Sequence, residues 1–174
     1  MNQQLLNNYF STYWRGQLNV YRYSGLSLSK NIKPEEWVLD VGCGINPFKP
    51  LIPNLVGIDP AFSQADYQTT IEDFKTEQRF DVAFCLGSIN FGSEETIKNQ
   101  INCVVNLLNP TARIYWRVNP GLRDHGNKEC KELDFFPWSK QLLEQYAQEF
   151  GFMLVETKQD LNNRLYSEWS RSNT

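Results

Sequence analysis

The most constraining feature of the sequence is an apolar run that ends in a turn with two alternating glycines. The run spans residues 37–41, and the turn continues as Gly42-Cys43-Gly44. An apolar run of this length that stops at glycine is typical of a strand buried inside a sheet. Glycines at alternate positions permit backbone angles that side chains forbid, and they let a ligand approach the main chain. We therefore expect a buried strand that leads into a binding turn.

Further strands and a helix are predicted downstream of this turn. Apolar runs at 55–59, 80–86 and 113–118 have the same buried-strand character. A helix is predicted over residues 93–108, because Ser93 is a favourable N-cap and apolar residues recur on one face. A proline just beyond this segment prevents the helix from continuing.

The two ends of the chain have patterns of their own. Residues 1–25 are rich in aromatic side chains at helical spacing, and a second clear helix is predicted at 139–150, closed by Gly151. Two extended runs follow, at 152–157 and 165–169. Because the connection between them is too short for a crossover helix, we expect an antiparallel hairpin. Strands that alternate with helices predict a mostly parallel, three-layer α/β sandwich.

Charge and composition exclude several classes of protein. The formal net charge is −3 at pH 7, without the positive excess that neutralises phosphates, so a nucleic acid partner is disfavoured. No apolar run approaches the roughly 18 residues of a membrane span, and the N-terminus does not resemble a signal peptide. The four cysteines show no CxxC spacing, and His125 is the single histidine. We therefore expect no disulfide framework and no metal site, and we predict a cytoplasmic protein with reduced thiols.

A second acidic residue follows the next predicted strand. Asp59 lies 19 positions after Asp40, close to the roughly 20 expected for an acid that binds a ribose hydroxyl. The fingerprint of a nicotinamide dinucleotide also needs a third glycine, which would fall on Pro47. A nicotinamide cofactor is therefore the less favoured of two alternatives.

With these motifs the sequence resembles the class I S-adenosylmethionine-dependent methyltransferases. The first motif, Leu39 to Gly44, is fairly specific, and the others carry weight through their order and spacing. These others are the stretches 56–59, 80–85 and 107–114, together with a helix that enters Gly-Phe at 138–152. The resemblance implies that S-adenosyl-L-methionine is the cofactor.

The resemblance covers residues 36–170 and also implies an architecture. It predicts a Rossmann-like three-layer α/β sandwich, whose mostly parallel seven-stranded sheet ends in an antiparallel C-terminal hairpin. We expect a single methyltransferase-like domain over residues 1–174, with an N-terminal helical cap at 1–35 and the cofactor-binding sheet at 36–174.

The same resemblance assigns roles around the glycine turn. Asp40 would orient the amino end of the methionine portion of the cofactor, directly or through water. The backbone of Gly42, Cys43 and Gly44 would form the wall against methionine and ribose. Asp59 would accept hydrogen bonds from both ribose hydroxyls.

Two later segments complete the implied cofactor site. Ile71 and Glu72 lie where members of the family line the adenine. Leu86, Gly87 and Ser88 follow the strand at 80–86, where the transferable methyl group usually points.

Two positions depart from the family pattern. Asn46 stands where a third glycine often occurs, and prolines follow it, so the helix after the turn is expected to be short or distorted. Thr70 stands in place of the acid that faces adenine, which leaves Glu72 or Asp73 as substitutes.

Residues outside the cofactor motifs must determine the selectivity for the methyl acceptor. Tyr9, Tyr13 and Trp14 either pack the N-terminal helix on the sheet, which is the favoured interpretation, or roof a substrate pocket. His125 either lies on the surface, which is again favoured, or acts as a general base at the carboxyl edge of the sheet.

The predicted function is therefore methyl transfer from S-adenosylmethionine to an acceptor that the sequence does not identify. A small molecule is favoured, because the segment after the strand at 80–86 lacks the Pro-Pro motif of enzymes that methylate amino groups of nucleic acids. The alternatives are methylation of a protein or nucleic acid, and a non-catalytic module that binds the cofactor. The sequence does not indicate an oligomeric state.

Overall fold

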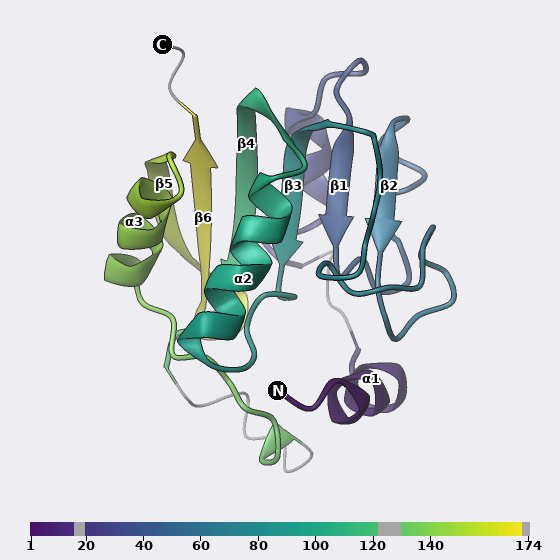
Figure 1. Cartoon of the computed structure of the whole chain (residues 1–174), viewed down its shortest axis with the longest axis vertical. Coiled ribbons are helices and arrows are strands. Elements are labelled where there is room, and N and C mark those ends of the chain that lie inside the picture. The colour runs from purple at the N-terminus through teal and green to yellow at the C-terminus, as the bar shows by residue number, and fades with distance from the viewer. Residues whose placement is uncertain (16–19, 122–129, 172–174) are drawn as a thin grey trace.

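The computed structural model describes residues 1–15, 20–121 and 130–171, and the structural statements below concern these residues. Six strands and several helices follow one another along the chain (Figure 1). They are α1 (Gln3–Thr12), η1 (Leu26–Asn31), β1 (Val38–Val41), β2 (Leu55–Ile58), β3 (Phe80–Leu86), α2 (Glu94–Val105), β4 (Leu108–Val118), α3 (Lys140–Glu149), β5 (Met153–Asp160), η3 (Leu161–Asn163) and β6 (Arg164–Ser170).

The strands form one mixed sheet in the order β2-β1-β3-β4-β6-β5. The first four strands in this order are parallel, and β6 runs antiparallel to both of its neighbours. The carboxyl ends of β1, β2 and β3 therefore meet at one edge of the sheet, and α1 lies beyond that edge (Figure 1). The predicted C-terminal hairpin and the two predicted helices at 93–108 and 139–150 are confirmed.

The prediction of seven strands is wrong, because the described residues form six. Between β2 and β3 the described chain forms one isolated parallel bridge to the sheet, from Tyr67 to Ile58. The Asp66 carboxylate accepts a hydrogen bond from the Gly57 amide at 2.8 Å, and the Gly57 carbonyl accepts from the amides of residues 66 and 67. This tight turn occupies the edge of β2, so a further strand does not form beside it.

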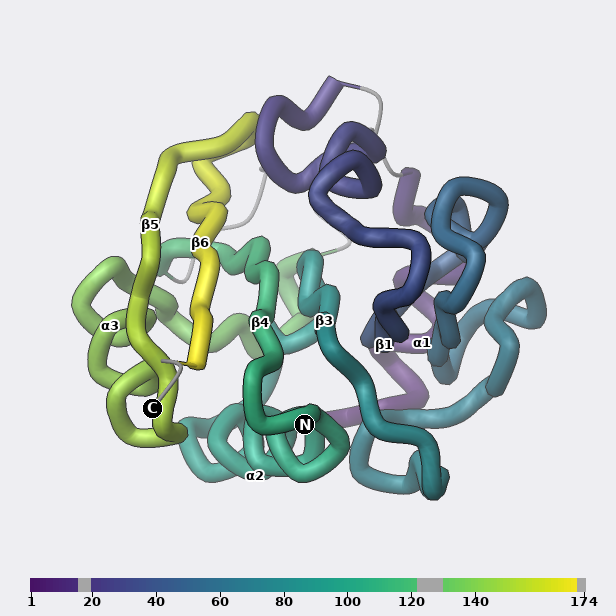
Figure 2. The backbone as a smooth tube through the Cα atoms, turned by 90° about the horizontal axis from the view of Figure 1, so that it is seen from above, coloured from purple at the N-terminus to yellow at the C-terminus, as the bar shows by residue number. Residues whose placement is uncertain are grey.

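Each face of the sheet is covered by a different kind of layer. Helices α2 and α3 pack on one face, and the segment that contains η1 lies on the other (Figure 2). On this second face Phe48 and Ile52, from the irregular segment that follows the glycine turn, pack with Leu28 of η1 on Val82 and Phe84. No helix forms between the turn and β2, so the expected distortion there amounts to loss of the helix.

The N-terminal helix is shorter than the predicted range of 1–25. Asn2 caps α1 by accepting a hydrogen bond from the Leu5 amide at 3.0 Å, and the helix ends at Thr12. Further along, the amides of Arg22 and Ser24 donate to the carboxylate of Asp160, at 3.1 and 3.0 Å. A distant side chain therefore takes the backbone donors that a continued helix would need.

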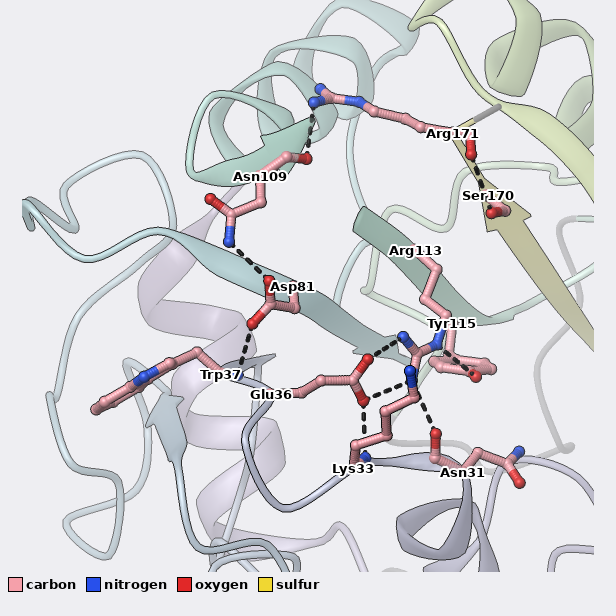
Figure 3. A network of polar contacts seen from close by, with 10 residues as sticks. All are labelled: Asn31, Lys33, Glu36, Trp37, Asp81, Asn109, Arg113, Tyr115, Ser170 and Arg171. Carbon is pink, nitrogen blue, oxygen red and sulfur yellow. Dashed lines mark hydrogen bonds and ion pairs between the residues drawn. The ribbon is translucent and has the colours of Figure 1, made fainter. Parts of the chain in front are cut away.

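A polar network closes the edge of the sheet opposite α1 (Figure 3). Glu36, which precedes β1, accepts two hydrogen bonds from the guanidinium of Arg113 on β4, at 2.6 and 2.9 Å. These hydrogen bonds hold the pKa of Glu36 below its usual value despite its burial. Asp81 accepts from the Trp37 amide at 2.9 Å and from Asn109 at 2.7 Å. The network ties the starts of β1, β3 and β4 together.

The described residues contain no candidate membrane span, metal cluster or disulfide. None of the helices is long and apolar enough to cross a membrane. Histidine, cysteine and acidic side chains nowhere form a group of three that could hold a metal ion, within the same ranges. The four cysteines are free thiols.

Candidate cofactor cleft

A cleft lies at the carboxyl edge of the sheet, between the ends of β1, β2 and β3 and helix α1. Its empty volume is about 840 Å³, including the part open to solvent. Open α/β sheets bind ligands at this edge because loops diverge there and leave a crevice.

The glycine turn forms the floor of the cleft. Gly42 and Gly44 adopt positive φ angles of 72° and 58°. The amides of Gly42 and Cys43 donate to the Ile58 carbonyl, at 2.8 and 3.0 Å, which binds the turn to β2. A Cβ atom at Gly42 would lie only 2.4 Å from the Cβ of Ser88. Glycine is therefore required there both for its backbone angle and for its lack of a side chain.

The departure at Asn46 is accommodated by its conformation. Asn46 has a φ of 60°, the left-handed region that asparagine tolerates better than most residues. Its side chain packs against Gly57, where an added Cβ would come within 2.6 Å of the Asn46 Oδ1. Asparagine therefore provides the backbone angle that a third glycine would otherwise supply.

Asp59 projects from the end of β2 into the cleft. Its Oδ2 accepts from the Gly44 amide at 2.9 Å, and its Oδ1 accepts from the Ala61 amide at 2.7 Å. Burial raises its pKa, and these backbone hydrogen bonds oppose the rise. The Phe62 amide is a third backbone donor to this carboxylate, and a carboxylate has about four acceptor positions, so acceptor capacity remains. The carboxylate is thus held rigidly and remains able to bind hydroxyl groups.

Asp40 lies behind the glycine turn and does not line the cleft surface. It is 3% exposed, and its Oδ2 has no hydrogen-bond partner among the described residues. Burial, and then the charge of Asp59, raise the pKa of Asp40 to about 8. Cys43 is likewise buried and absent from the lining, and burial also raises the pKa of its thiol.

At the far end of the cleft, the segment that follows β2 meets helix α2, which is distant from it in the sequence. Ile71 and Glu72 line the cleft, and Gln100 of α2 reaches it from the neighbouring helix. The Gln100 amide nitrogen donates to a Glu72 carboxylate oxygen at 2.8 Å. The Gln100 Oε1 is buried and has no partner in the described chain. Of the two acids left open for this position, only Glu72 lines the cleft.

Sequence reasoning missed Gln100, although a signal for it existed. Gln100 is 7% exposed and lies beside Ile97 and Ile101 on the buried face of α2. A polar side chain on the apolar face of a helix needs a partner, because burial of an unpaired polar group is costly. Thr70 also lines the cleft, but its hydroxyl donates to Asp73 at 3.0 Å.

The opposite wall of the cleft is the loop after β3. Leu86, Gly87 and Ser88 all line it, and the Ser88 Oγ is buried without a partner among the described residues. Asn90 fixes this loop, because its amide donates to the Gly87 carbonyl at 3.0 Å and accepts from the Asn119 amide at 2.9 Å. The wall is therefore held by a buried side chain of its own loop.

Only some of the predicted substrate-pocket residues line the cleft. Trp14 lines the cleft and lies over Gly44, and Phe10 of α1 lines it as well. Tyr9 is buried elsewhere, where its hydroxyl accepts from the Cys130 thiol at 2.8 Å. Tyr13 is 52% exposed and does not line the cleft. His125 lies outside the described residues.

Comparison with known proteins gives a result at the level of structure. No protein-family model matches the chain, and no curated protein matches it by sequence. Among solved structures it is similar to 1,6-didemethyltoxoflavin-N1-methyltransferase from Burkholderia thailandensis, with bound 1,6-didemethyltoxoflavin and S-adenosylhomocysteine. This match has a TM-score of 0.68 and 15% identity over 85% of this chain and 75% of that one.

Two further solved structures extend the result. Magnesium protoporphyrin IX methyltransferase from Synechocystis PCC 6803, with bound S-adenosylhomocysteine, matches with a TM-score of 0.67 and 14% identity, over 98% of this chain and all of that one. N-methyltransferase NodS from Bradyrhizobium japonicum WM9 matches with a TM-score of 0.64 and 17% identity, over 85% and 84%. The chain therefore has the fold of the class I S-adenosylmethionine-dependent methyltransferases.

Proposed function

We propose that this protein is a methyltransferase that takes S-adenosylmethionine (SAM) as cofactor and a small molecule as acceptor. The observation that carries the proposal is the cleft at the carboxyl edge of the sheet, which combines the glycine turn with the fixed carboxylate of Asp59. The similar solved structures support the choice of cofactor, since they contain S-adenosylhomocysteine (SAH).

The unpartnered polar atoms around the cleft fit this cofactor. The buried Asp40 Oδ2 lies behind the turn, where a carboxylate suits an ammonium group. The buried Gln100 Oε1 is an acceptor without a donor at the other end, which suits the amino group of adenine. Asp59 lines the cleft and keeps acceptor capacity for ribose hydroxyls. We assign Asp40, Asp59 and Gln100 to these three parts of the cofactor.

The remaining predicted residues would shape the site. Gly42 and Gly44 expose the main chain at the floor, Ile71 offers an apolar surface beside Glu72, and Ser88 crowds the turn from the opposite wall. Cys43 would contribute its backbone only, because its side chain is buried away from the cleft.

The chain's contribution to catalysis is positioning. When bound, SAM supplies a methyl group on a positively charged sulfur, ready for direct displacement by an acceptor lone pair. The rigid Asp59 carboxylate and the loop fixed by Asn90 would hold the reactants in line, and α1 would exclude water. Such alignment supplies several kcal/mol without a covalent intermediate. A general base is needed only where the acceptor must lose its proton during attack.

The covered cleft favours a small acceptor over a macromolecule. Helix α1 places Leu6, Asn7 and Phe10 in the lining, so the acceptor would have to fit beneath this helix. The net charge of −3 also disfavours a polyanionic acceptor. The free thiols fit a reducing compartment such as the cytoplasm, where we place the reaction.

Calorimetric titration of the full chain with SAM and SAH tests the proposal. We expect both to bind, and we expect Asp59→Ala to weaken SAH binding at least about tenfold, since one charge-assisted hydrogen bond contributes about 1.5–3 kcal/mol. Glu144→Ala, on the exposed face of α3, serves as the matched control with unchanged affinity. Folded protein that binds neither compound would refute the proposal.

Binding alone would also fit a non-catalytic module, so turnover must be measured separately. SAM with a labelled methyl group is incubated with the protein and a panel of small acceptors. Label transferred to an acceptor, with release of SAH, supports an enzyme. Binding without transfer to any acceptor supports the module instead.

A further inference from the structure

One part of the cleft consists of aromatic rings that no cofactor role uses. Phe10 and Trp14 come from the N-terminal segment, Phe62 follows β2 and Phe91 follows β3. We call these four rings the aromatic roof. Phe10 meets Phe91 at 5.7 Å between ring centroids, Trp14 meets Phe62 at 6.2 Å, and Phe10 and Trp14 are 6.3 Å apart. The rings form a continuous chain across the cleft.

The geometry of the roof suits a planar ligand. The contact between Phe10 and Phe91 and the contact between Trp14 and Phe62 are edge-on, with interplanar angles of 74° and 72°. Phe91 is buried and also packs on Phe135 at 4.9 Å, whereas Phe10, Trp14 and Phe62 are half-buried. The faces of these three rings can stack on, or meet the edges of, another aromatic ring. Three separate chain segments hold the roof, so it is not a by-product of one helix.

The charged side chains around the cleft are acidic. Among the described residues that line it, the only charged side chains are Asp59 and Glu72. A second cavity shares Leu6 and other residues with the cleft, and its charged side chains, within the same described ranges, are Glu132 and Asp134. The terminal ammonium of Met1 lines both cavities as well, so four carboxylates face one cation there, and the local field favours cations over anions.

The basic residues of the N-terminal region do not reverse this field at the lining. Arg15, Arg22, Lys30 and Lys33 are absent from the lining of both cavities. An anionic ligand would gain no charged hydrogen bond from these four side chains. A cation would benefit both from the acids and from the negative faces of the rings.

We propose that the acceptor is a planar aromatic or heteroaromatic molecule that is uncharged or cationic, and not a carboxylate or a phosphate ester. This inference rests on the proposed function. On such an acceptor a heteroatom lone pair would form the bond to the methyl carbon, the carbon–sulfur bond would break with its electron pair left on sulfur, and a proton on the acceptor atom would pass to solvent.

Matched bicyclic probes test the inference. Full-length protein saturated with SAH is titrated calorimetrically with quinoline, 1-methylquinolinium and quinoline-3-carboxylate. We expect the first two to bind, and the carboxylate to bind at least about tenfold more weakly, because carboxylates outnumber the Met1 ammonium around the two cavities. Equal or tighter binding of the carboxylate would overturn the inference.

Two tryptophan variants provide the structural control. Trp14→Ala removes one ring of the roof and should weaken quinoline binding about fivefold, the size of one aromatic contact. Trp37→Ala removes a ring that is 38% exposed at the opposite edge of the sheet and should leave the affinity unchanged (Figure 3). Unchanged quinoline affinity in Trp14→Ala would also overturn the inference.

The first step of the experiment separates this inference from the proposed function. If folded protein does not bind SAH, the proposed function is refuted and the inference falls with it. If SAH binds and the probes show no preference against negative charge, only the inference is refuted.

Discussion

Three buried polar atoms of the candidate site stand out at the scale of single residues. Asp40 Oδ2, Ser88 Oγ and Gln100 Oε1 have no partner among the described residues. Leaving a buried polar group unpaired costs about 1–3 kcal/mol, so such groups persist where a ligand or water completes them. Each of these atoms therefore provides a test of ligand binding at its own position.

Gln100→Leu should weaken SAH binding about two- to tenfold, because it removes the acceptor that we assign to the adenine amino group. One hydrogen bond contributes about 0.5–1.5 kcal/mol. S-inosylhomocysteine, which has a carbonyl in place of that amino group, should bind the unmodified protein weakly and should lose little in the variant. Calorimetry with both compounds checks this. Equal losses for the two compounds would contradict the assignment.

The raised pKa of Asp40 predicts that cofactor binding is coupled to the release of a proton. Its pKa is raised to about 8 by burial and by Asp59, so the carboxyl is largely protonated at neutral pH without ligand. An ammonium group beside it favours the carboxylate and lowers this pKa. SAH binding should then release a proton between about pH 6 and pH 8. Calorimetry in buffers of different ionisation enthalpy measures this release, which Asp40→Asn should abolish.

The pH dependence of stability follows from the same shift, with a defined sign. A carboxyl whose pKa is higher in the folded than in the unfolded protein stabilises the fold at low pH, and this contribution is lost as pH rises from the unfolded value of about 4 to the folded value of about 8. The free energy of unfolding should therefore fall over this range by more in the unmodified protein than in Asp40→Asn.

At the scale of elements, a buried ion pair joins β4 to the C-terminal hairpin, and Ser24 of the N-terminal segment hydrogen-bonds to it. Arg117 at the end of β4 lies 3.2 Å from the Asp160 carboxylate at the end of β5. Asp160 also accepts from the Ser24 hydroxyl at 2.6 Å. Burial raises the pKa of Asp160, but hydrogen bonds from Ser24 and Leu161 and the charge of Arg117 outweigh it, so the pKa is lowered.

Asp160→Ala should cost about 3–5 kcal/mol of unfolding free energy, because it leaves the Arg117 charge buried and unpaired. Glu156→Ala is the control, since its pair with Lys158 is partly exposed and such pairs contribute about 0–1 kcal/mol. Denaturant unfolding measures both changes. A loss for Asp160→Ala no larger than for Glu156→Ala would show that the buried pair does not anchor the N-terminal segment.

At the scale of the whole molecule, the two edges of the sheet have different roles. The amino edge is closed by the Glu36–Arg113 pair and its neighbours (Figure 3), and the carboxyl edge is left open beneath α1 (Figure 1). A ligand in the cleft would contact β1, β2, α1 and α2 together. Binding should therefore stabilise the fold as a unit and not one element alone.

SAH should accordingly raise the midpoint of thermal unfolding. At a free concentration of 100 times Kd, binding to the folded state alone adds about 2.7 kcal/mol. For a chain of this size each kcal/mol corresponds to about 2–4 °C, so we expect a rise of about 5–10 °C. Scanning calorimetry with and without SAH measures it, and adenosine at the same excess serves as the weaker-binding control. No rise at saturating SAH would contradict binding to the folded protein.

Much of the architecture could be predicted from the sequence, because its signals are local. The apolar period of α2 and α3, the caps at Ser93 and Ser139, and the short connection of the hairpin each lie within a few residues. The glycine turn after β1 and the acid after β2 also carry their chemistry in their own positions. Such features do not depend on distant partners, so the class I methyltransferase fold could be inferred.

The sequence-based predictions of the long N-terminal helix and of a seventh strand were wrong because a side chain distant in the sequence determined the local structure. The predicted N-terminal helix does not reach residue 25, because the amides of Arg22 and Ser24 donate to Asp160 instead. Asp66 turns back onto Gly57, so a seventh strand does not form. In both places a carboxylate satisfies backbone donors that the local pattern leaves open.

The sequence by itself determined the order of strands and helices and the motifs of the glycine turn and Asp59. Only the tertiary structure decided which side chains share the cleft. It brought Gln100 from α2 to Glu72, buried Tyr9 against Cys130, and turned Tyr13 towards solvent. The physical reason is that side-chain facing depends on packing between segments far apart in the chain, and local periodicity does not encode that packing.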